Sequence, residues 1–405
     1  MSMQKTLLLL GGAQHQVCAI QAAKRLGYRT VLCDYLTDNP GQYEADVFYL
    51  KSTTDRDAML EVAKREHVDG VISFGSDAAL PSAAYVAEQL GLPTNPLASV
   101  ETLSNKHLFR AYLSEHGFNC PQAVSFGVDD SDKEVSRICE GLRRPIIIKP
   151  TDSSGSKGVT IIESGNQGLK EALAKAREYS RNHVLVAEEF LTYEYPHLIG
   201  GDIFVVNGKV TFWGLMDCLR DERVAKLVPV GKAYPTSLAP EFRAMLKQEV
   251  QRLVDSLGLQ FGEMNLEVIV GPGGKPYIIE LGGRAGGNLI PQQLSDISGI
   301  DLVEASVRCA MGDMPDDTSF DGNDRFIATH VVHSCKDGIL QSIEIDKSLK
   351  PFIYRTLIYV TEGDSVKKIR NGSEGIGHIF LRFESLNQMH AILNNINDLV
   401  KINVA

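Results

Sequence analysis

The sequence predicts an α/β and α+β protein built from several domains. A chain of 405 residues is too long for one compact core. Its first part alternates apolar strand-like segments with helix-like segments, which is typical of a doubly wound parallel sheet. Its end instead contains closely spaced strand-like segments. We expect a Rossmann-like domain at 1–97, a central domain at 98–322 with a subdomain at about 120–190, and a small α+β domain at 323–405.

The first domain contains four strand-like segments. They lie at 6–12, 29–35, 46–52 and 69–75, and helix-like segments at 17–28, 56–68 and 78–92 alternate with them. Gly11 and Gly12 end the first strand, but the G-x-G-x-x-G spacing of a dinucleotide site is absent. A doubly wound domain with a tight first turn is therefore preferred over a nicotinamide site.

Pro93 and Pro96 mark the end of the first domain, and a helix containing Lys106 and Arg110 follows. Strands, Gly-rich turns and helices continue to about residue 320, without a low-complexity tract or a repeat. The chain then changes character. Strand-like runs at 326–334, 338–345, 355–360 and 378–385 precede one amphipathic helix at 386–400.

The composition excludes several classes of protein. A net charge of −10 argues against a protein dedicated to DNA or RNA, although a local basic cluster could hold an anionic small molecule. The seven cysteines are odd in number and widely spaced, so reduced thiols are expected rather than disulfides or a zinc site. No apolar run approaches the roughly 20 residues of a membrane helix, and the N-terminal run is too short for a signal peptide. We expect a cytoplasmic protein that binds neither nucleic acid nor membranes.

The stretch PIIIKPTDSSGSKGV at 145–159 places a buried strand directly before a Ser/Gly-rich loop. The backbone N–H groups of such a loop can close around phosphate oxygens. Lys149 at the strand end and Lys157 in the loop would add positive charge. The P-loop pattern is absent, and Ser-Gly-Ser is also ordinary turn chemistry. This stretch alone leaves phosphate binding and a solvated hairpin tip equally open.

A β-hairpin is predicted for residues 264–282, with its turn at Gly271–Gly274. Glu267 lies within an otherwise apolar strand, and Glu280 ends the returning strand. Carboxylates are rarely buried without a partner, so two that face the same way on adjacent strands indicate a Mg²⁺ site. Arg284 follows and could hold a further anionic group. The alternative is a pair of carboxylates on a solvated sheet face, but the apolar residues around them favour burial.

Residues 183–195 form the third motif, a strand that runs into Glu188-Glu189-Phe190-Leu191 and then breaks. The backbone of such a segment can pair with the edge of an adenine. In their order and spacing, the three motifs and Lys106 together resemble the carboxylate–amine ligases of the ATP-grasp superfamily, in the branch of the L-amino-acid ligases and carbamoyl-phosphate synthetase. The resemblance covers the whole chain. It implies a pre-ATP-grasp domain, an ATP-grasp core whose subdomain is a lid, and a small C-terminal domain.

The resemblance also implies a role for each motif. Lys106 and the catalytic Lys149 would hold the ATP phosphates, and the catalytic Arg284 would steady the transferred phosphoryl group or the acyl phosphate. Glu267 and Glu280 would ligate magnesium, for which manganese could substitute. The lid over the phosphates would consist of Ser153, Ser154, Gly155, Ser156, Lys157 and Gly158. The adenine pocket would be lined by Glu188, Glu189 and Leu191.

Two positions depart from the family pattern. The family reads E-I-N-P-R at the second metal strand, where this chain has Glu280 followed by Leu-Gly-Gly-Arg. Gly282 thus replaces an asparagine that assists the metal, and Asn265 or Asn288 could compensate. The expected glycine and acid after the adenine segment are also displaced, which leaves Glu194 as the candidate for binding the ribose.

The implied reaction transfers the γ-phosphoryl group of ATP to a small carboxylic acid, such as an amino acid. An amine then displaces phosphate from the acyl phosphate, and the products include ADP and phosphate. No protein nucleophile is needed. The resemblance also implies a homodimer. Two other functions stay open: a carboxylase-like or carbamoyl-phosphate-synthetase-like enzyme that activates bicarbonate, and a nucleotide-binding protein without turnover.

Further residues are candidates for binding the two substrates. His15 and Asp77 follow strands of the first domain, where doubly wound sheets bind ligands, and could meet the amine. For His15, a loop residue without a role is preferred. Arg220, Arg223 and Lys226 are candidate anchors for the acid, or belong to an exposed charged loop. The sequence does not identify the acid or the amine.

Overall fold

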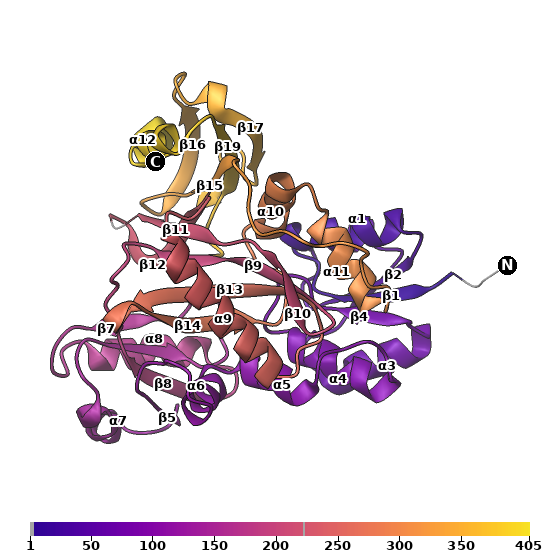
Figure 1. Cartoon of the computed structure of the whole chain (residues 1–405), viewed down its shortest axis with the longest axis horizontal. Helices are drawn as coiled ribbons and strands as arrows, with labels where there is room; N and C mark the ends of the chain where they lie inside the picture. Colours follow the sequence, from indigo (N-terminus) through magenta and orange to yellow (C-terminus); the bar gives the residue numbers. More distant parts are fainter. Residues whose placement is uncertain (1–3, 222) are drawn as a thin grey trace.

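The computed structural model describes residues 4–221 and 223–405 (Figure 1). Its N-terminal part is a parallel sheet of order β3-β2-β1-β4, which confirms the doubly wound topology. Its strands are β1 (Thr6–Leu10), β2 (Arg29–Asp34), β3 (Val47–Leu50) and β4 (Gly70–Ile72). Its helices are α1 (Val17–Arg25), α2 (Gly41–Glu44), α3 (Arg56–Glu66) and α4 (Leu80–Leu90). All five residues of β1 are buried, as a central strand covered by helices on both faces requires.

Two helices, α5 (Leu97–Ser104) and α6 (Lys106–Glu115), lead into a small antiparallel sheet of order β5-β8-β6-β7. The strands of this sheet are β5 (Ala123–Gly127), β6 (Ile146–Pro150), β7 (Thr160–Ile162) and β8 (Val184–Glu189). Helices α7 (Asp132–Ile138) and α8 (Leu169–Tyr179) pack against it around a separate apolar core. The lower left of Figure 1 shows this unit, which carries the Ser/Gly loop between β6 and β7.

The largest sheet has nine strands, eight of them in the order β14-β13-β9-β11-β12-β15-β19-β17, with β10 beside β9. Its central strands are β9 (Leu198–Val206), β10 (Lys209–Trp213), β11 (Met216–Asp221), β12 (Ala225–Tyr234), β13 (Phe261–Gly271) and β14 (Lys275–Gly282). The predicted hairpin of β13 and β14 is present, and its turn is a short 3-10 segment, Pro272–Gly274.

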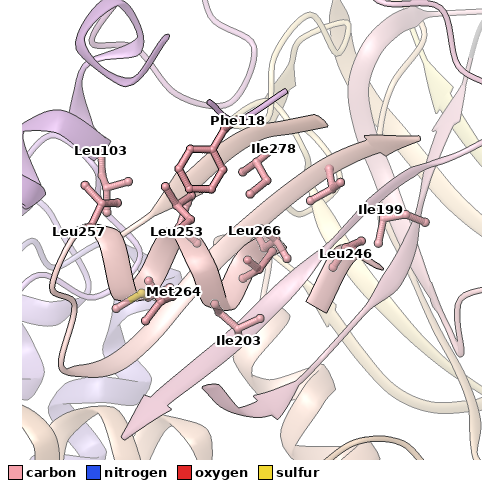
Figure 2. Close-up of a cluster of buried hydrophobic side chains, with 14 of the residues drawn as sticks. Leu103, Phe118, Ile199, Ile203, Leu246, Leu253, Leu257, Met264, Leu266 and Ile278 are labelled. Carbon is pink, nitrogen blue, oxygen red and sulfur yellow. The ribbon is translucent and has the colours of Figure 1, made fainter. Parts of the chain in front are cut away.

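Helix α9 (Pro240–Ser256) covers one face of this sheet. Figure 2 shows Leu246 and Leu253 of α9 directed at Met264 and Leu266 of β13, and all four side chains are buried. Burial of each such side chain contributes roughly 1.5–3 kcal/mol to folding. Helices α10 (Ile290–Ser298) and α11 (Leu302–Ala310) follow the hairpin, and α11 also packs against α1 of the N-terminal sheet.

The C-terminal segment continues the large sheet, because β15 pairs with β12. Its strands are β15 (Phe326–Val332), β16 (Gly338–Ile345), β17 (Ile353–Ile358), β18 (Ser365–Val366), β19 (Gly377–Phe383) and β20 (Val400–Val404). Strands β15, β19 and β17 lie side by side, whereas β18, β16 and β20 form a second small sheet.

The end of the chain differs from the single helix expected at 386–400. Helix α12 (Leu386–Leu393) stops early, α13 (Ile396–Leu399) is one turn, and the chain then forms β20 against β16. Two consecutive asparagines explain the break, since Asn is a poor helix former and Asn395 has φ −117°. Within the residues described, no helix has the length and hydropathy needed to span a bilayer.

Candidate active site

The two carboxylates of the hairpin lie directly opposite one another. Glu267 of β13 is the cross-strand partner of Glu280 of β14. Directly opposed side chains share one face of a sheet, with Cβ atoms about 5 Å apart. Burial, and then the charge of Glu280, raises the pKa of Glu267, whereas Lys232, Arg220 and Lys106 lower it. Two acids that repel one another among three cations form a site that suits a divalent cation.

This donor set fits magnesium bound together with a nucleotide. No group of three or more His, Cys, Asp or Glu side chains is arranged to hold a metal in the described chain, 4–221 and 223–405. Magnesium keeps several ligand positions for water and phosphate oxygens, so two carboxylates are enough. Lys106 Nζ lies 3.9 Å from Glu280 Oε2 and donates a 2.6 Å hydrogen bond to the carbonyl of Ser153. Lys106 therefore connects the carboxylates to the Ser/Gly loop.

The space next to Gly282, where a side chain would lie, is occupied by the side chains of Asp77 and Arg284. A Cβ there would lie 3.3 Å from Asp77 Oδ1 and 3.4 Å from Arg284 Cζ. Asn265, which pairs with Gly282 across the hairpin, donates instead to Asp202 Oδ1 at 2.7 Å. Asn288 lies in the loop before α10 with a positive φ of 52°. The place of the family's asparagine is thus filled by the Asp77–Arg284 ion pair.

Asp77 and Arg284 join the N-terminal sheet to the hairpin. Arg284 Nη2 donates to Asp77 Oδ2, and Ser154 of the loop helps to lower the pKa of Asp77. Burial would raise the pKa of Asp77, but Arg284 and Lys106 hold it below its usual range. Arg284 Nη1 donates to the carbonyl of Ala285 at 2.9 Å, while its buried Nε has no partner among the described residues. Arg284 therefore has one direction left for an anionic ligand.

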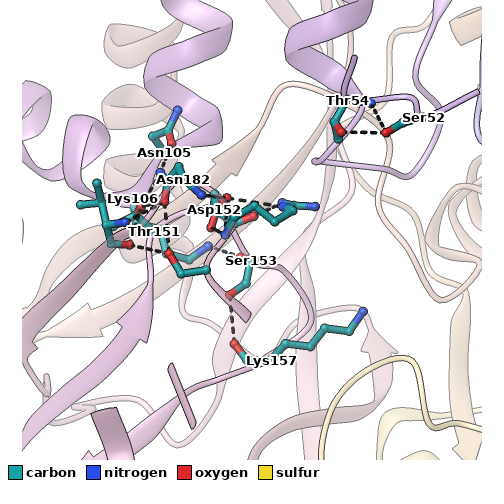
Figure 3. Close-up of polar contacts among 12 residues, drawn as sticks. Ser52, Thr54, Asn105, Lys106, Thr151, Asp152, Ser153, Lys157 and Asn182 are labelled. Atoms are coloured by element: carbon teal, nitrogen blue, oxygen red, sulfur yellow. Dashed lines mark hydrogen bonds and ion pairs between the residues drawn. The ribbon is translucent and has the colours of Figure 1, made fainter. Parts of the chain in front are cut away.

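The loop from Ser153 to Gly158 closes over this centre. Ser153 Oγ donates to the carbonyl of Lys157 at 2.9 Å, and Ser156 Oγ donates to the carbonyl of Leu227 at 3.1 Å. The N–H of Gly372, from the C-terminal segment, donates to the carbonyl of Gly155 at 2.8 Å. Figure 3 shows Lys106 beside Ser153, with the side chain of Lys157 extending away from them.

Glu188 is held between two buried cations. Lys149 Nζ donates to Glu188 Oε1, and Arg110 Nε donates to Glu188 Oε2 at 2.9 Å. Burial opposes the ionisation of Glu188, but Arg110 and Lys149 lower its pKa to about 2. Burial lowers the pKa of Lys149 to about 8. Strands β6 and β8 are adjacent, so the strand of the phosphate motif and the strand of the adenine motif share this ion-pair group.

The remaining adenine-motif residues lie elsewhere around the same strand. Glu189 faces the opposite side of β8 and accepts from the backbone N–H and the Nη2 of Arg143, each at 2.9 Å. Leu191 belongs to a buried apolar cluster with Leu198, Cys218 and Ile269 on the face that carries Glu267. The cluster thus joins the segment just after β8 of the small sheet to β9, β11 and β13 of the large one, which suits a flat apolar ligand.

Glu194 has partners of its own. Its two carboxylate oxygens accept 2.8 Å hydrogen bonds from the backbone N–H groups of Gly273 and Gly274, in the turn of the hairpin. These bonds hold Glu194 at the hairpin turn, three residues after Leu191, and its role in binding the ribose stays a prediction. Two of the three candidate acid anchors have defined partners. Arg223 donates to Asp221, and the charge of Arg220 lowers the pKa of Glu267.

Lys232 is a site residue that the sequence did not single out. It is 6% exposed, and its Nζ lies 2.9 Å from Cys218 Sγ. A Cβ at Gly200, the cross-strand partner of Glu267, would lie 2.6 Å from both Lys232 Nζ and Cys218 Sγ. The ammonium therefore crosses β11 and β9 toward Glu267. A lysine within the apolar run LVPVGKAY was the available signal.

A second acid pair, Asp202 and Glu263, lies deeper in the same region. Asp202 accepts from Asn265 and from the N–H of Gly286, each at 2.7 Å, and Ser306 donates to Glu263 at 3.0 Å. Burial, and then the charge of Asp202, raises the pKa of Glu263 well above its usual range. Burial also raises the pKa of Asp202, and the buried Glu263 Oε1 has no hydrogen-bond partner among the described residues.

Comparisons with known proteins agree with this geometry. The family model described as carbamoyl-phosphate synthase L chain, ATP binding domain matches residues 105–316, and the ATP-grasp N-terminal domain matches 20–94. A formate-dependent phosphoribosylglycinamide formyltransferase of Synechococcus sp. (strain CC9605) is 31% identical over 197 residues, covering 48% of this chain and 49% of that protein. The chain spans about half, or less, of the length of the curated relatives it matches.

Two solved structures share the whole fold. The L-amino acid ligase from Bacillus licheniformis has a TM-score of 0.82 at 21% identity, with 100% of both chains covered. The biotin carboxylase domain of the Hydrogenobacter thermophilus 2-oxoglutarate carboxylase, in complex with MgADP, ADP and bicarbonate, has a TM-score of 0.74 at 17% identity. It covers 100% of this chain and 92% of that one. Because its central half matches the family model, the chain belongs to the ATP-grasp superfamily, in the family of the carbamoyl-phosphate synthase L chain ATP-binding domain.

Proposed function

We propose that this protein is an ATP-dependent ligase that joins a small carboxylic acid to an amine through an acyl phosphate. The observation that carries the proposal is the opposed pair Glu267 and Glu280, linked by Lys106 to the Ser/Gly loop. A site of paired buried acids, several cations and a closing loop suits phosphoryl transfer, which depends on positioning and charge neutralisation.

The nucleotide would lie between the small sheet and the large one. Leu191 and its apolar cluster would contact the adenine, and the backbone of Glu188 to Leu191 would pair with its edge. Lys106 and Lys149 would bind phosphate oxygens, and the loop at 153–158 would cover them. Magnesium, when bound by Glu267 and Glu280, would neutralise charge on the phosphates.

The protein's own groups would then position the acid and protect the intermediate. A carboxylate is a poor electrophile until it is phosphorylated. Transfer of the γ-phosphoryl group to a carboxylate oxygen breaks the bond between the γ-phosphorus and the β–γ bridging oxygen, which leaves with ADP. Lys232, Arg220 and Arg284 are the cations available to hold the acid beside this group. The closed loop would exclude water, which would otherwise hydrolyse the acyl phosphate.

Measurement of phosphate release tests the proposal. Mg-ATP would be offered with single amino acids, amino-acid pairs, polyamines, thiols and bicarbonate. We expect release that requires one acid and one amine, and that is lost in Glu280→Gln. The matched control is Glu61→Gln on the exposed face of α3, which should behave as the wild type. Manganese in place of magnesium would test the choice of metal.

The other outcomes are also informative. Release with bicarbonate alone would move the protein to the carboxylase-like alternative, for which the structural neighbour with bound bicarbonate is the precedent. Tight binding of ATP without phosphate release in any mixture would refute the ligase. The protein would then be a nucleotide-binding protein without turnover.

A further inference from the structure

A tight turn of the C-terminal segment touches the Ser/Gly loop. This C-terminal turn, residues 370–375, lies between β18 and β19, and the N–H of its Gly372 donates to the carbonyl of Gly155 at 2.8 Å. The two glycines are in contact, because a Cβ at Gly372 would lie 3.5 Å from Gly155 Cα. The tip of the loop is therefore held by a segment outside residues 105–316, which match the ATP-binding domain.

The C-terminal turn is fixed by its own side chains. Asn371 Oδ1 accepts from the N–H of Ser373 at 3.0 Å. Glu374 Oε2 accepts from the N–H groups of Arg370 and Asn371, at 2.6 and 3.2 Å. The N–H of Glu374 donates to the carbonyl of Asn371 at 3.3 Å and closes the turn. Four of these five consecutive N–H groups are thus used within the turn, and the fifth, that of Gly372, is directed at the loop.

The Ser/Gly loop depends on contacts from outside. Gly155 and Ser156 both have a φ of 63°, and a residue with a side chain keeps such a conformation where its surroundings impose it. Ser156 Oγ donates to the carbonyl of Leu227 on β12, and Lys106 of α6 donates to the carbonyl of Ser153. Together with the C-terminal turn, three separate parts of the chain hold the loop in its closed position.

We propose that the C-terminal turn is a latch for the Ser/Gly loop, and that Gly372 is a positioning residue whose N–H keeps the loop closed over the nucleotide. This proposal rests on the proposed function. The latch matters most after phosphoryl transfer, because an open loop admits water. Water would attack the acyl carbon, and the C–O bond would break with its electron pair on phosphate. One proton of the water would end on phosphate and the other in solution, so ATP would be consumed without an amide.

Two substitutions at one position separate the N–H from the rest of Gly372. Gly372→Pro removes the N–H. Proline suits this place, because neither Gly372 nor Ser373 has a positive φ, as in a type I turn with proline at its second position. Gly372→Ala keeps the N–H, and its Cβ would make ordinary contacts with Gly155. Alanine is therefore the matched control.

Trypsin measures the opening of the loop without turnover. Lys157 lies within the loop, and cleavage after it tracks the fraction of molecules whose loop is open. In Gly372→Pro we expect cleavage at Lys157 to be about threefold to tenfold faster than in wild type, as for loss of one hydrogen bond. In Gly372→Ala it should stay within twofold of wild type. Cleavage at other sites and the melting midpoint should not change in either variant.

The yield of amide per phosphate measures the latch during turnover. With the acid and amine that support phosphate release, wild type should form an amide for each phosphate. Gly372→Pro should form several-fold less amide per phosphate, and Gly372→Ala should match wild type. A merely structural defect would lower amide and phosphate together and would leave this ratio unchanged.

Every other outcome decides the question. Equal cleavage at Lys157 in wild type and Gly372→Pro would overturn the latch, and so would faster cleavage with an unchanged ratio of amide to phosphate. If Gly372→Pro is cleaved at many sites, it is misfolded and Asn371→Ala replaces it. This variant loosens the turn by removing the acceptor for Ser373, and no faster cleavage at Lys157 would then overturn the latch. If wild type releases no phosphate with any mixture, the proposed function fails, whereas the trypsin comparison still tests the contact itself.

Discussion

Strand β13 carries two glutamates, four residues apart on the same face, that the fold treats differently. Glu267 and its partner Glu280 lie among Lys232, Arg220 and Lys106, whose charges offset their repulsion. Glu263 and its partner Asp202 have hydrogen bonds from Ser306, Asn265 and a backbone N–H instead. The cations around the first pair suit a site for a metal and further anions, whereas burial raises the pKa of both acids of the second pair.

The comparison shows that burial alone does not identify a functional acid. Both glutamates are buried enough for burial to be the largest cause of a raised pKa. What distinguishes them is the neighbourhood: cations around one pair, neutral donors around the other. Cations near a buried acid pair indicate a site for further anions and a metal, and neutral donors indicate a structural pair.

The largest effect is expected for Glu267→Gln. It removes one of the two carboxylates from the proposed metal site, so phosphate release should fall by about 100-fold or more. The thermal midpoint should stay the same or rise, because a like-charge contact is relieved. Phosphate release and a melting curve, with Glu61→Gln as the control, check both parts. Activity within tenfold of wild type would remove Glu267 from the site.

Glu263→Gln should have the opposite effect to Glu267→Gln, with a change in the pH dependence of stability and little change in activity. Since folding raises the pKa of Glu263, its contribution is full below its ordinary pKa and is lost as the pH rises through the folded value. Wild type should therefore lose stability with rising pH above about 5, and Glu263→Gln should lose less. We expect a gain of about 1–3 kcal/mol for the variant at alkaline pH, with activity within a few-fold.

Urea unfolding from pH 5 to 9 measures this difference. Parallel pH profiles for wild type and Glu263→Gln would contradict the raised pKa of Glu263. A large loss of phosphate release, with the fold intact, would instead move the second pair into the reaction.

Gly200→Ala tests whether the ammonium group of Lys232 contributes to the site formed by Glu267 and Glu280. The added Cβ would lie 2.6 Å from both Lys232 Nζ and Cys218 Sγ, so both buried side chains must shift. We expect phosphate release to fall several-fold, and stability to fall by about 1–3 kcal/mol because the buried site becomes overpacked. Gly141→Ala is the control, because a Cβ there meets no atom within 4 Å. Unchanged activity would show that the ammonium has no part in the site.

The sequence revealed Glu267 and Glu280 because a carboxylate within an apolar strand is an anomaly that needs a partner. Lys232 lies in a similar strand, but a lysine is a weaker signal, since its long chain can reach water from many positions. The doubly wound domain and the hairpin were predictable from local periodicity and turn residues. The same periodicity missed β20, which is short and follows directly after a helical turn.

Contacts between distant segments could not be predicted in this way. Asp77 and Arg284 are 207 residues apart, and their ion pair explains the space that Gly282 leaves. No local pattern shows that the carboxyl end of β4 meets the end of the hairpin.

The smallest effect is expected for Glu194→Gln, which tests the predicted ribose contact. In the structure its carboxylate accepts from two N–H groups of the hairpin turn, far along β13 and β14 from the opposed acids. The neutral amide should accept these bonds less strongly and cost about 1 kcal/mol of stability. The KM for ATP should stay within twofold of wild type, measured by phosphate release at varied ATP. A tenfold rise in that KM at unchanged stability would return Glu194 to the nucleotide, and would mean that the turn gives up its hydrogen bonds when ATP is present.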